Sequence, residues 1–338
     1  MTRDRKLGVG AFVLLLVALA AFPYLGTSGY HVSMASTVLI AGMLASTVNF
    51  LAAEGGLASL GHGAIAGAAA YGAGWSSLQG HSMSVQILMA MGVGVLVTLA
   101  YGLLSMRTNG IYFLMVTLAV GMVVYGLAYR LSSVTRGENG ISGIGRPEFL
   151  AEPWAFYLFV VASFAVTTGI IWVVTKSPFG ATLRGIRDSE SRMRSLGYYV
   201  PAYKLGAFMI SGTVASFAGL LAVWHTHFVS PSATEVGRSV LLIVMVILGG
   251  LGTTTGPLVG AAIVVLVENV LSNSVERWPT VLGLIFILTI LFARAGLVGS
   301  AAKLLRRRRR DGASGRDPDD DVLALTDTRT PSGSTPSA

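Results

Sequence analysis

Residues able to carry acid–base, metal or phosphate chemistry are few in this sequence. The five histidines (His31, His62, His81, His225 and His227) form no H-E-x-x-H pattern, and there is no cysteine, so neither a zinc site nor a thiol nucleophile is indicated. None of the four lysines follows a glycine-rich phosphate loop, and there is no G-x-S-x-G motif. We therefore expect a chain that is not an enzyme and that binds no cofactor or metal.

Ionisable side chains inside apolar segments are equally scarce. Ion-coupled transporters usually place such groups in mid-membrane, where they bind the coupling ion. The two candidates here are Glu54 and Glu268, and both fall near expected segment ends, so we interpret them as interfacial. A transporter of this kind would take its energy from a partner protein.

Small and polar residues within apolar segments are the remaining candidates for contact with a solute. Unwound glycine segments expose carbonyl and N–H groups at membrane depth, which suits a small zwitterion. The competing interpretation is helix packing, since Gly63 and Gly67 form a G-x-x-x-G face, and we expect His62 to bond a neighbouring carbonyl. The candidate translocation path consists of Ser59, Gly61, His62, Gly63, Tyr112, Thr117, Gly249 and Gly250.

The elements that would position these residues are membrane helices. Of 338 residues, 53% are hydrophobic and 12% are charged, with a mean hydropathy of +0.69, whereas soluble domains carry about 25% charged residues. We therefore predict an all-α polytopic membrane protein with a permease domain at 1–300. Stretches long enough to span, at about 20 residues each, lie at 7–25, 34–53, 57–78, 84–106, 111–130, 154–175, 205–227, 237–251, 254–272 and 279–297.

The charge distribution predicts how about ten transmembrane helices are oriented. With every stretch crossing, 17 lysines and arginines fall on one side and five on the other, and the positive-inside rule then places both termini in the cytoplasm. The run 249–257 predicts a glycine-rich break between two short helices. Residues 7–25 resemble a cleavable signal peptide at Ala18-Leu19-Ala20, but they exceed the usual apolar length, so we expect a retained span.

The segment beyond the last predicted span has a different composition. Residues 301–338 begin with a basic run, Lys303 to Arg310, and continue as a polar stretch without apolar periodicity. We predict a disordered cytoplasmic tail. The basic run directly after a membrane helix indicates binding to anionic lipid rather than to nucleic acid.

One cytoplasmic loop, 176–204, looks ordered. Ser177-Pro178 is a helix-start signal, and Gly197 is placed to end a helix. Leu183, Ile186, Met193 and Leu196 supply an apolar stripe among charged residues. This pattern fits either a surface amphipathic helix or a short helical pair that docks into a cytosolic partner.

Four ordered motifs resemble the LivM type of branched-chain amino acid ATP-binding-cassette (ABC) permease, a family of inner-membrane proteins. They are GGLASLGHGAIAGAAAYGAG (55–74), RTNGIYFLMVTLAVGMVVY (107–125) with TRGENGISGI (135–144), the loop with its following helix (177–223), and SVLLIVMVILGGLGTTTGPLVGAA (239–262). The resemblance covers residues 35–300. It implies that Gly180, Arg184, Arg187, Asp188, Glu190 and Gly197 form the contact with an ATPase.

The same resemblance implies the partners and the mechanism. They are a second, LivH-like permease, two cytosolic ABC ATPases and an extracytoplasmic solute-binding protein, all meeting a chain embedded in membrane lipid. Closure of the ATPases would push the loop and rock helices 154–175 and 205–227. The loop with Arg136, Glu138, Asn139 and Arg146 would either receive the binding protein or be a solvated hairpin. A urea or short-amide importer, a stand-alone secondary transporter and a membrane enzyme are the alternatives.

Overall fold

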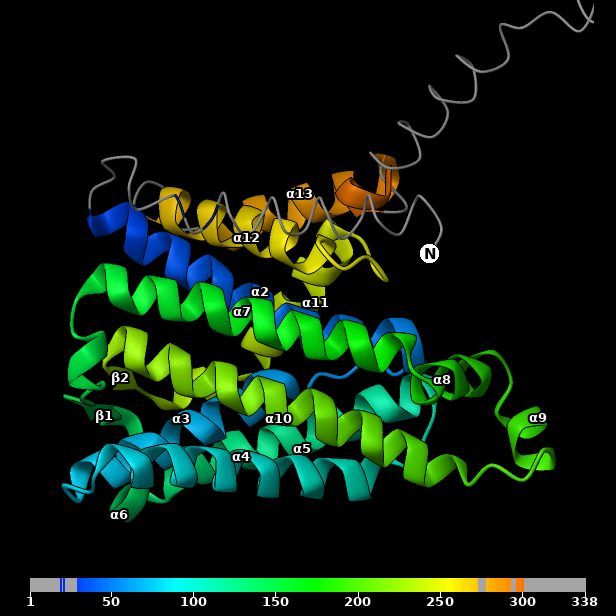
Figure 1. The fold of residues 1–338 in the computed structure, drawn as a ribbon, viewed down its shortest axis with the longest axis horizontal. Helices are drawn as coiled ribbons and strands as arrows, with labels where there is room; N and C mark the ends of the chain where they lie inside the picture. Colours follow the sequence, from blue (N-terminus) through cyan, green and yellow to red (C-terminus); the bar gives the residue numbers. More distant parts are fainter. Residues whose placement is uncertain (1–18, 20, 22–28, 273–277, 293–295, 301–338) are drawn as a thin grey trace, which may run out of the picture.

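The computed structural model describes residues 19, 21, 29–272, 278–292 and 296–300. Helices dominate this part of the chain, and one short β-ribbon joins two of its loops (Figure 1). In chain order the elements are α2 (Gly29–Gly55), α3 (His62–Leu78), α4 (Met83–Ser105), α5 (Gly110–Arg130), α6 (Ser132–Thr135), η2 (Gly137–Asn139), β1 (Ile141–Ser142), η3 (Glu148–Leu150), α7 (Pro153–Lys176), α8 (Pro178–Asp188), α9 (Glu190–Ser195), α10 (Val200–Thr226), β2 (Phe228–Val229), η4 (Pro231–Thr234), α11 (Val236–Gly249), α12 (Gly256–Ser272) and α13 (Trp278–Phe292).

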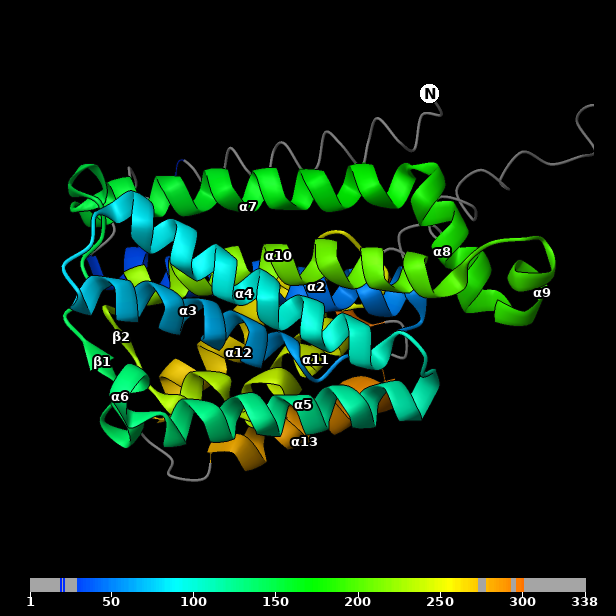
Figure 2. The ribbon, with the colours of Figure 1, turned by 90° about the horizontal axis from the view of Figure 1, so that it is seen from below.

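The long helices lie side by side along the longest axis of the molecule (Figure 1). Five of them, α2, α4, α5, α7 and α10, are long and apolar enough to cross a membrane. The stretch predicted at 154–175 forms α7, Pro153–Lys176, and the stretch at 111–130 forms α5, Gly110–Arg130. We call the end that carries α8 and α9 the hairpin end, and the opposite end, with β1 and β2, the ribbon end (Figure 2).

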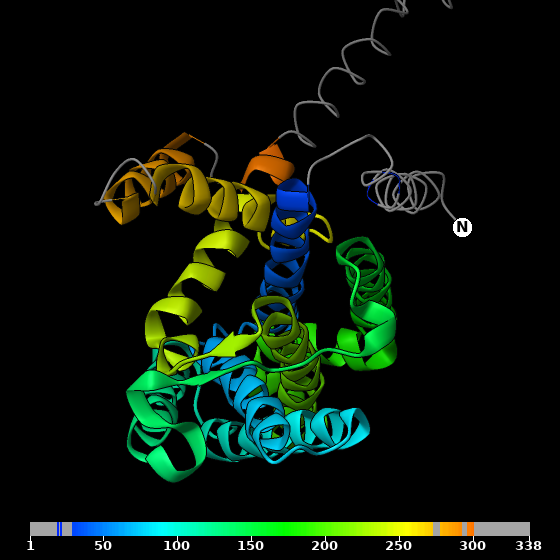
Figure 3. The same ribbon diagram turned by 90° about the vertical axis from the view of Figure 1, so that its left-hand side faces the viewer.

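Small residues bring the central helices α3, α4 and α10 close together. A Cβ added to Gly219 of α10 would meet the Ala66 backbone of α3, and one added to Gly212 would meet Thr98 of α4. Glycine at such positions lets helix backbones approach in lipid. Seen from the ribbon end, α10 lies between α3 and α4 on one side and α2 on the other (Figure 3).

Non-helical backbone separates consecutive helices inside the molecule at two places. The chain leaves α2 at Gly55 and becomes helical again only at His62, so the stretch predicted at 57–78 begins five residues late. Residues 56–61 run into the interior from the hairpin end (Figure 2). The second interruption is the glycine-rich break that the sequence predicts, between α11 and α12.

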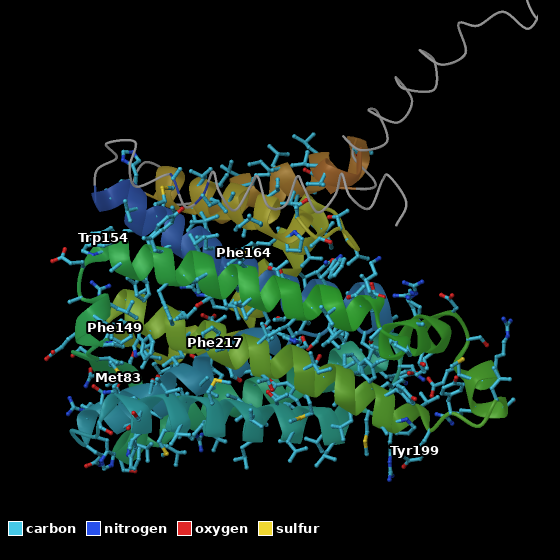
Figure 4. All side chains as sticks on the ribbon, viewed as in Figure 1. Met83, Phe149, Trp154, Phe164, Tyr199 and Phe217 are labelled. Atoms are coloured by element: carbon cyan, nitrogen blue, oxygen red, sulfur yellow. The ribbon has the colours of Figure 1, made fainter. Side chains whose placement is uncertain are left out.

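The loops at the ribbon end are tied together by backbone hydrogen bonds. β1 pairs with β2 antiparallel, with Ile141 opposite Val229, and the Ile144 N–H donates to the His227 carbonyl. The loop after α5 is therefore fixed to the end of α10. Phe149 and Trp154 lie on the exposed surface of this end (Figure 4).

Several predicted features lie outside the described residues. They are most of the first span at 7–25, the basic run from Lys303 and the tail at 301–338. The number of crossings and the orientation of the termini therefore stay predictions.

Candidate functional site

The hairpin end is built from two short helices, α8 and α9, which we call the coupling hairpin (residues 178–195). Ser177 caps α8, because its hydroxyl accepts the Gly180 N–H at 3.4 Å, and Ser189 caps α9 in the same way through Arg192. Gly197 follows α9 with a φ of +85°, a conformation that favours glycine. The loop is thus a helical pair, one of the two structures its sequence allowed.

Two arginines bind the coupling hairpin to the end of α2. Arg184 forms an ion pair with Glu54 at 2.5 Å and also donates to the Thr175 carbonyl at 3.0 Å. Arg187 donates to the Ala53 carbonyl. Because the last carbonyls of a helix lack partners within it, cations at this position satisfy them and complement the helix dipole. Glu54, predicted as interfacial, is only 14% exposed at this junction.

A buried lysine connects α9 to two other elements. Lys204 of α10 is 3% exposed and lies 2.8 Å from Glu190 of α9, and its ammonium also donates to Asn109, the residue before α5. Burial alone raises the pKa of Glu190, but hydrogen bonds and the charge of Lys204, with Arg194, outweigh it and lower that pKa. The sequence analysis missed Lys204 and Asn109. A lysine four residues into an apolar helix was the available signal.

The interior holds a polar cluster around His62, at the first residue of α3. Its Nε2 lies 2.8 Å from the Ser211 hydroxyl and its Nδ1 lies 3.2 Å from the Ser59 hydroxyl. Ser211 donates its own hydrogen to the Thr47 carbonyl at 2.9 Å, so Nε2 must carry a proton and donate to Ser211. The Ser59 hydroxyl beside Nδ1 also accepts the Gly61 N–H. Both ring nitrogens therefore have hydrogen-bond partners.

The expectation that His62 bonds a neighbouring carbonyl is wrong. Its partners are hydroxyls, and one of them comes from α10, which is 149 positions away in the chain. Only the tertiary packing of α10 against α3 brings Ser211 to the ring. Nothing local to His62 in the sequence indicated it.

The neighbouring predicted residues join this cluster through the backbone of the α2–α3 break. The Leu60 N–H donates to the Thr117 hydroxyl of α5 at 3.1 Å, and the Gly63 N–H donates to Ser239 of α11 at 3.1 Å. A side chain at Gly61 would overlap the buried Tyr101 ring. Ser59, Gly61, His62, Gly63 and Thr117 therefore lie together. We call these five residues with Ser211 the interior cluster.

The other predicted path residues lie elsewhere. Tyr112 is 74% exposed on the outer surface of α5. Gly249 is the last residue of α11, and Gly250 begins the turn to α12. The Gly250 carbonyl accepts from Thr253, and a Cβ on Gly249 would overlap Gly256. This turn is held to α2 by Asn49, whose amide donates to the Thr253 carbonyl and accepts the Gly252 N–H.

The chemistry available at the interior cluster is hydrogen bonding by neutral groups. It contains hydroxyls, one imidazole and backbone amides, and none of its members carries a carboxylate, an ammonium or a guanidinium. No group of three or more histidine, aspartate or glutamate side chains that would hold a metal occurs in the described ranges.

Comparison with known proteins agrees with this arrangement. The family described as branched-chain amino acid transport system, permease component, matches residues 30–294. The LivM permease of the high-affinity branched-chain amino acid transport system of Salmonella typhimurium is 27% identical over 315 residues, covering 84% of this chain and 73% of LivM. The autoinducer 2 import permease LsrC of Photorhabdus laumondii is 27% identical over 218 residues, covering 59% of this chain and 61% of LsrC.

The solved structure of a metal-chelate type ABC transporter in an inward-facing conformation has a similar fold. It superimposes with a TM-score of 0.51 at 16% identity, covering 85% of this chain and 99% of the other. The likeness concerns the fold alone. Because the family match spans residues 30–294 and the helices are long and apolar, this chain, a multi-pass membrane protein and not an enzyme, belongs to the family of permease components of branched-chain amino acid transport systems.

Proposed function

We propose that this chain is the membrane permease subunit of an ABC importer in a plasma (inner) membrane, and that it translocates branched-chain amino acids. In this proposal it pairs with a second, LivH-like permease, two cytosolic ATPases bind the coupling hairpin, and an extracytoplasmic protein delivers the solute at the ribbon end. The hairpin end is then cytoplasmic, in accord with the positive-inside rule.

The observation that carries the proposal is the connection between the coupling hairpin and the α2–α3 break. Arg184 and Arg187 bind Glu54 and the Ala53 carbonyl at the end of α2. Gly56, the first residue of the break, packs against the Arg187 side chain. A displacement of α8 would therefore move residues 56–61 directly. Those residues contain Ser59 and lead into His62, so ATPase movement would reach the interior cluster through one short stretch of chain.

This route adds a third helix to the mechanism expected from the sequence. The sequence analysis assigned the motion to the helices that flank the loop, now α7 and α10. Arg184 and Arg187 instead point to α2 as the first helix to move, because their partners Glu54 and Ala53 lie on it.

Branched-chain side chains fit a path of this chemistry, because an apolar helix interior accepts apolar groups, whereas an unpaired ion there would lose far more solvation free energy than a neutral polar group. The similarity to LsrC, an autoinducer 2 import permease, supports keeping other small polar solutes, including urea and short amides, as the alternative.

Reconstitution tests the proposal. The chain, its second permease, the two ATPases and the binding protein are incorporated into vesicles, and uptake of labelled leucine is measured with and without ATP. We expect uptake only with ATP and with the binding protein present, and competition by isoleucine and valine but not by urea. Accumulation driven by an ion gradient in vesicles that hold this chain alone would contradict the proposal.

A further inference from the structure

A cavity lies at the hairpin end, apart from the interior cluster. It has a volume of about 430 Å³ and is lined by Arg107, Arg194, Tyr198, Tyr199, Val200 and Pro201. These residues come from three segments: the α4–α5 connection, α9 with its following link, and the start of α10. Tyr199 lies at the outer edge of this end (Figure 4). We call this cavity the arginine pocket.

The charge of the arginine pocket is positive. Its two charged lining residues are both arginines, and no carboxylate lines it. Arg194 pairs with one oxygen of Glu190 and Lys204 pairs with the other, so two cations share one anion. Arg107 is exposed and forms no ion pair with any residue that the structure describes. Guanidinium groups with tyrosine hydroxyls make a suitable set of donors for a phosphate.

An apolar surface leads from this pocket along α4. Leu88, Leu96 and Leu103 are exposed on one side of that helix, and Arg107 lies in the connection just after its end at Ser105. In a membrane protein such a surface contacts acyl chains, and arginines at helix ends extend to the headgroup level. A free phosphate would make no use of this surface, whereas a phospholipid would use both it and the pocket.

We propose that the arginine pocket binds the phosphate headgroup of an anionic phospholipid whose acyl chain lies along α4. The bound headgroup links Arg107 of the α4–α5 connection to Arg194 of α9. It therefore steadies the coupling hairpin against the membrane domain. This inference goes beyond the transport proposal and does not depend on which solute is carried.

The test measures lipid binding to the permease pair, with and without its ATPases, by native mass spectrometry. Phosphatidylglycerol is titrated against phosphatidylcholine in nanodiscs, and the retained lipid is counted. We expect selective retention of phosphatidylglycerol, and Arg107→Gln and Arg194→Gln each to weaken it by roughly fivefold. The matched controls, Arg192→Gln on α9 and Arg130→Gln at the ribbon end, should leave it unchanged. Arg107→Lys, which keeps the charge, should retain more binding than Arg107→Gln.

Several results would overturn the proposal. They are equal retention of the two lipids, an equal loss in the control variants, displacement of phosphatidylglycerol by millimolar glycerol phosphate or inorganic phosphate, and retention that vanishes once the ATPases bind. The third result would indicate a soluble phosphate ligand, and the fourth a pocket used by the ATPase. Size-exclusion profiles identify any variant that fails to fold. If Arg107→Gln fails to fold, retention of phosphatidylglycerol by Arg107→Lys is compared with that of wild type instead, and a loss equal to that of Arg194→Gln would contradict the role of the charge.

Discussion

Lys204 keeps a positive charge almost completely buried, and this has an energetic consequence. Its partners are Glu190, Asn109 and the Thr108 carbonyl. Of these three partners only Glu190 is negatively charged, so it alone neutralises the Lys204 ammonium. A buried charge left without its counterion destabilises a protein strongly, whereas removal of both charges does not.

We therefore expect Glu190→Gln to destabilise the permease by about 3 kcal/mol. The double variant Glu190→Gln with Lys204→Met should recover most of the loss, because no buried charge then lacks a partner. The measurement is the Tm of the purified protein for wild type, both single variants and the double variant. A double variant as unstable as Glu190→Gln alone would show that the charge pair is not the cause.

The pH dependence of this contact follows from the lowered pKa of Glu190. A carboxylate whose folded pKa lies below its ordinary value of 4.5 stabilises the folded state at pH values above 4.5. That contribution is lost as the pH falls through the folded pKa. Thermal stability should therefore show no contribution from Glu190 titration between pH 7 and 5, and should fall below 4.5. In Glu190→Gln this component of the acid loss should be absent.

At the scale of elements, the α2–α3 break depends on the close approach of Gly61 to Tyr101. A Cβ at Gly61 would lie within 2.8 Å of three atoms of the Tyr101 ring, which is fully buried. We expect Gly61→Ala to destabilise the protein by roughly 1–3 kcal/mol, because overpacking forces neighbouring groups apart.

Thermal unfolding of Gly61→Ala measures this effect, with Gly92→Ala as the matched control, since a Cβ at Gly92 meets no atom within 4 Å. The double variant Gly61→Ala with Tyr101→Ala should lose less free energy of unfolding than the two single variants lose in sum. Strict additivity of the two changes would contradict the steric explanation.

The sequence predicted where most helices begin and end, because the length of an apolar run determines a span. It failed at residues 57–61, which are as apolar as their neighbours and still leave the helical conformation. The cause is tertiary: Thr117 takes the Leu60 N–H, and Tyr101 fills the space beside Gly61. It succeeded at the α11–α12 break, where Gly249, Gly250 and Pro257 mark the interruption locally.

At the candidate site, the residues of the loop could be named from the sequence, but their partners in other helices could not. The resemblance to LivM-type permeases implied a role for Arg184, Arg187 and Glu190, which lie in one contiguous stretch of the sequence. The partners Glu54, Ala53 and Lys204 were not assigned to it, since they come from helices that meet the hairpin only after folding.

At the scale of the whole molecule, the proposed route has force on the coupling hairpin enter through the Arg184–Glu54 pair. Reversing one charge should separate the two activities of the assembled complex, so that Glu54→Arg leaves ATP hydrolysis and strongly reduces uptake. The exchanged variant, Glu54→Arg with Arg184→Glu, should recover uptake, because it restores an attractive pair in the same place. Both rates are measured in the reconstituted complex. Uptake in Glu54→Arg equal to that of wild type would mean that the pair is not in the route.

The last two turns of α2 contact α8, α10 and the α11–α12 turn. Thr47 accepts from Ser211 of α10, Asn49 holds the α11–α12 turn, and Ala53 and Glu54 bind α8. Both non-helical interruptions are thus fastened to the same eight residues, 47–54. We therefore expect the two interruptions to shift together with this end of α2, so that the permease switches between its states in one concerted step.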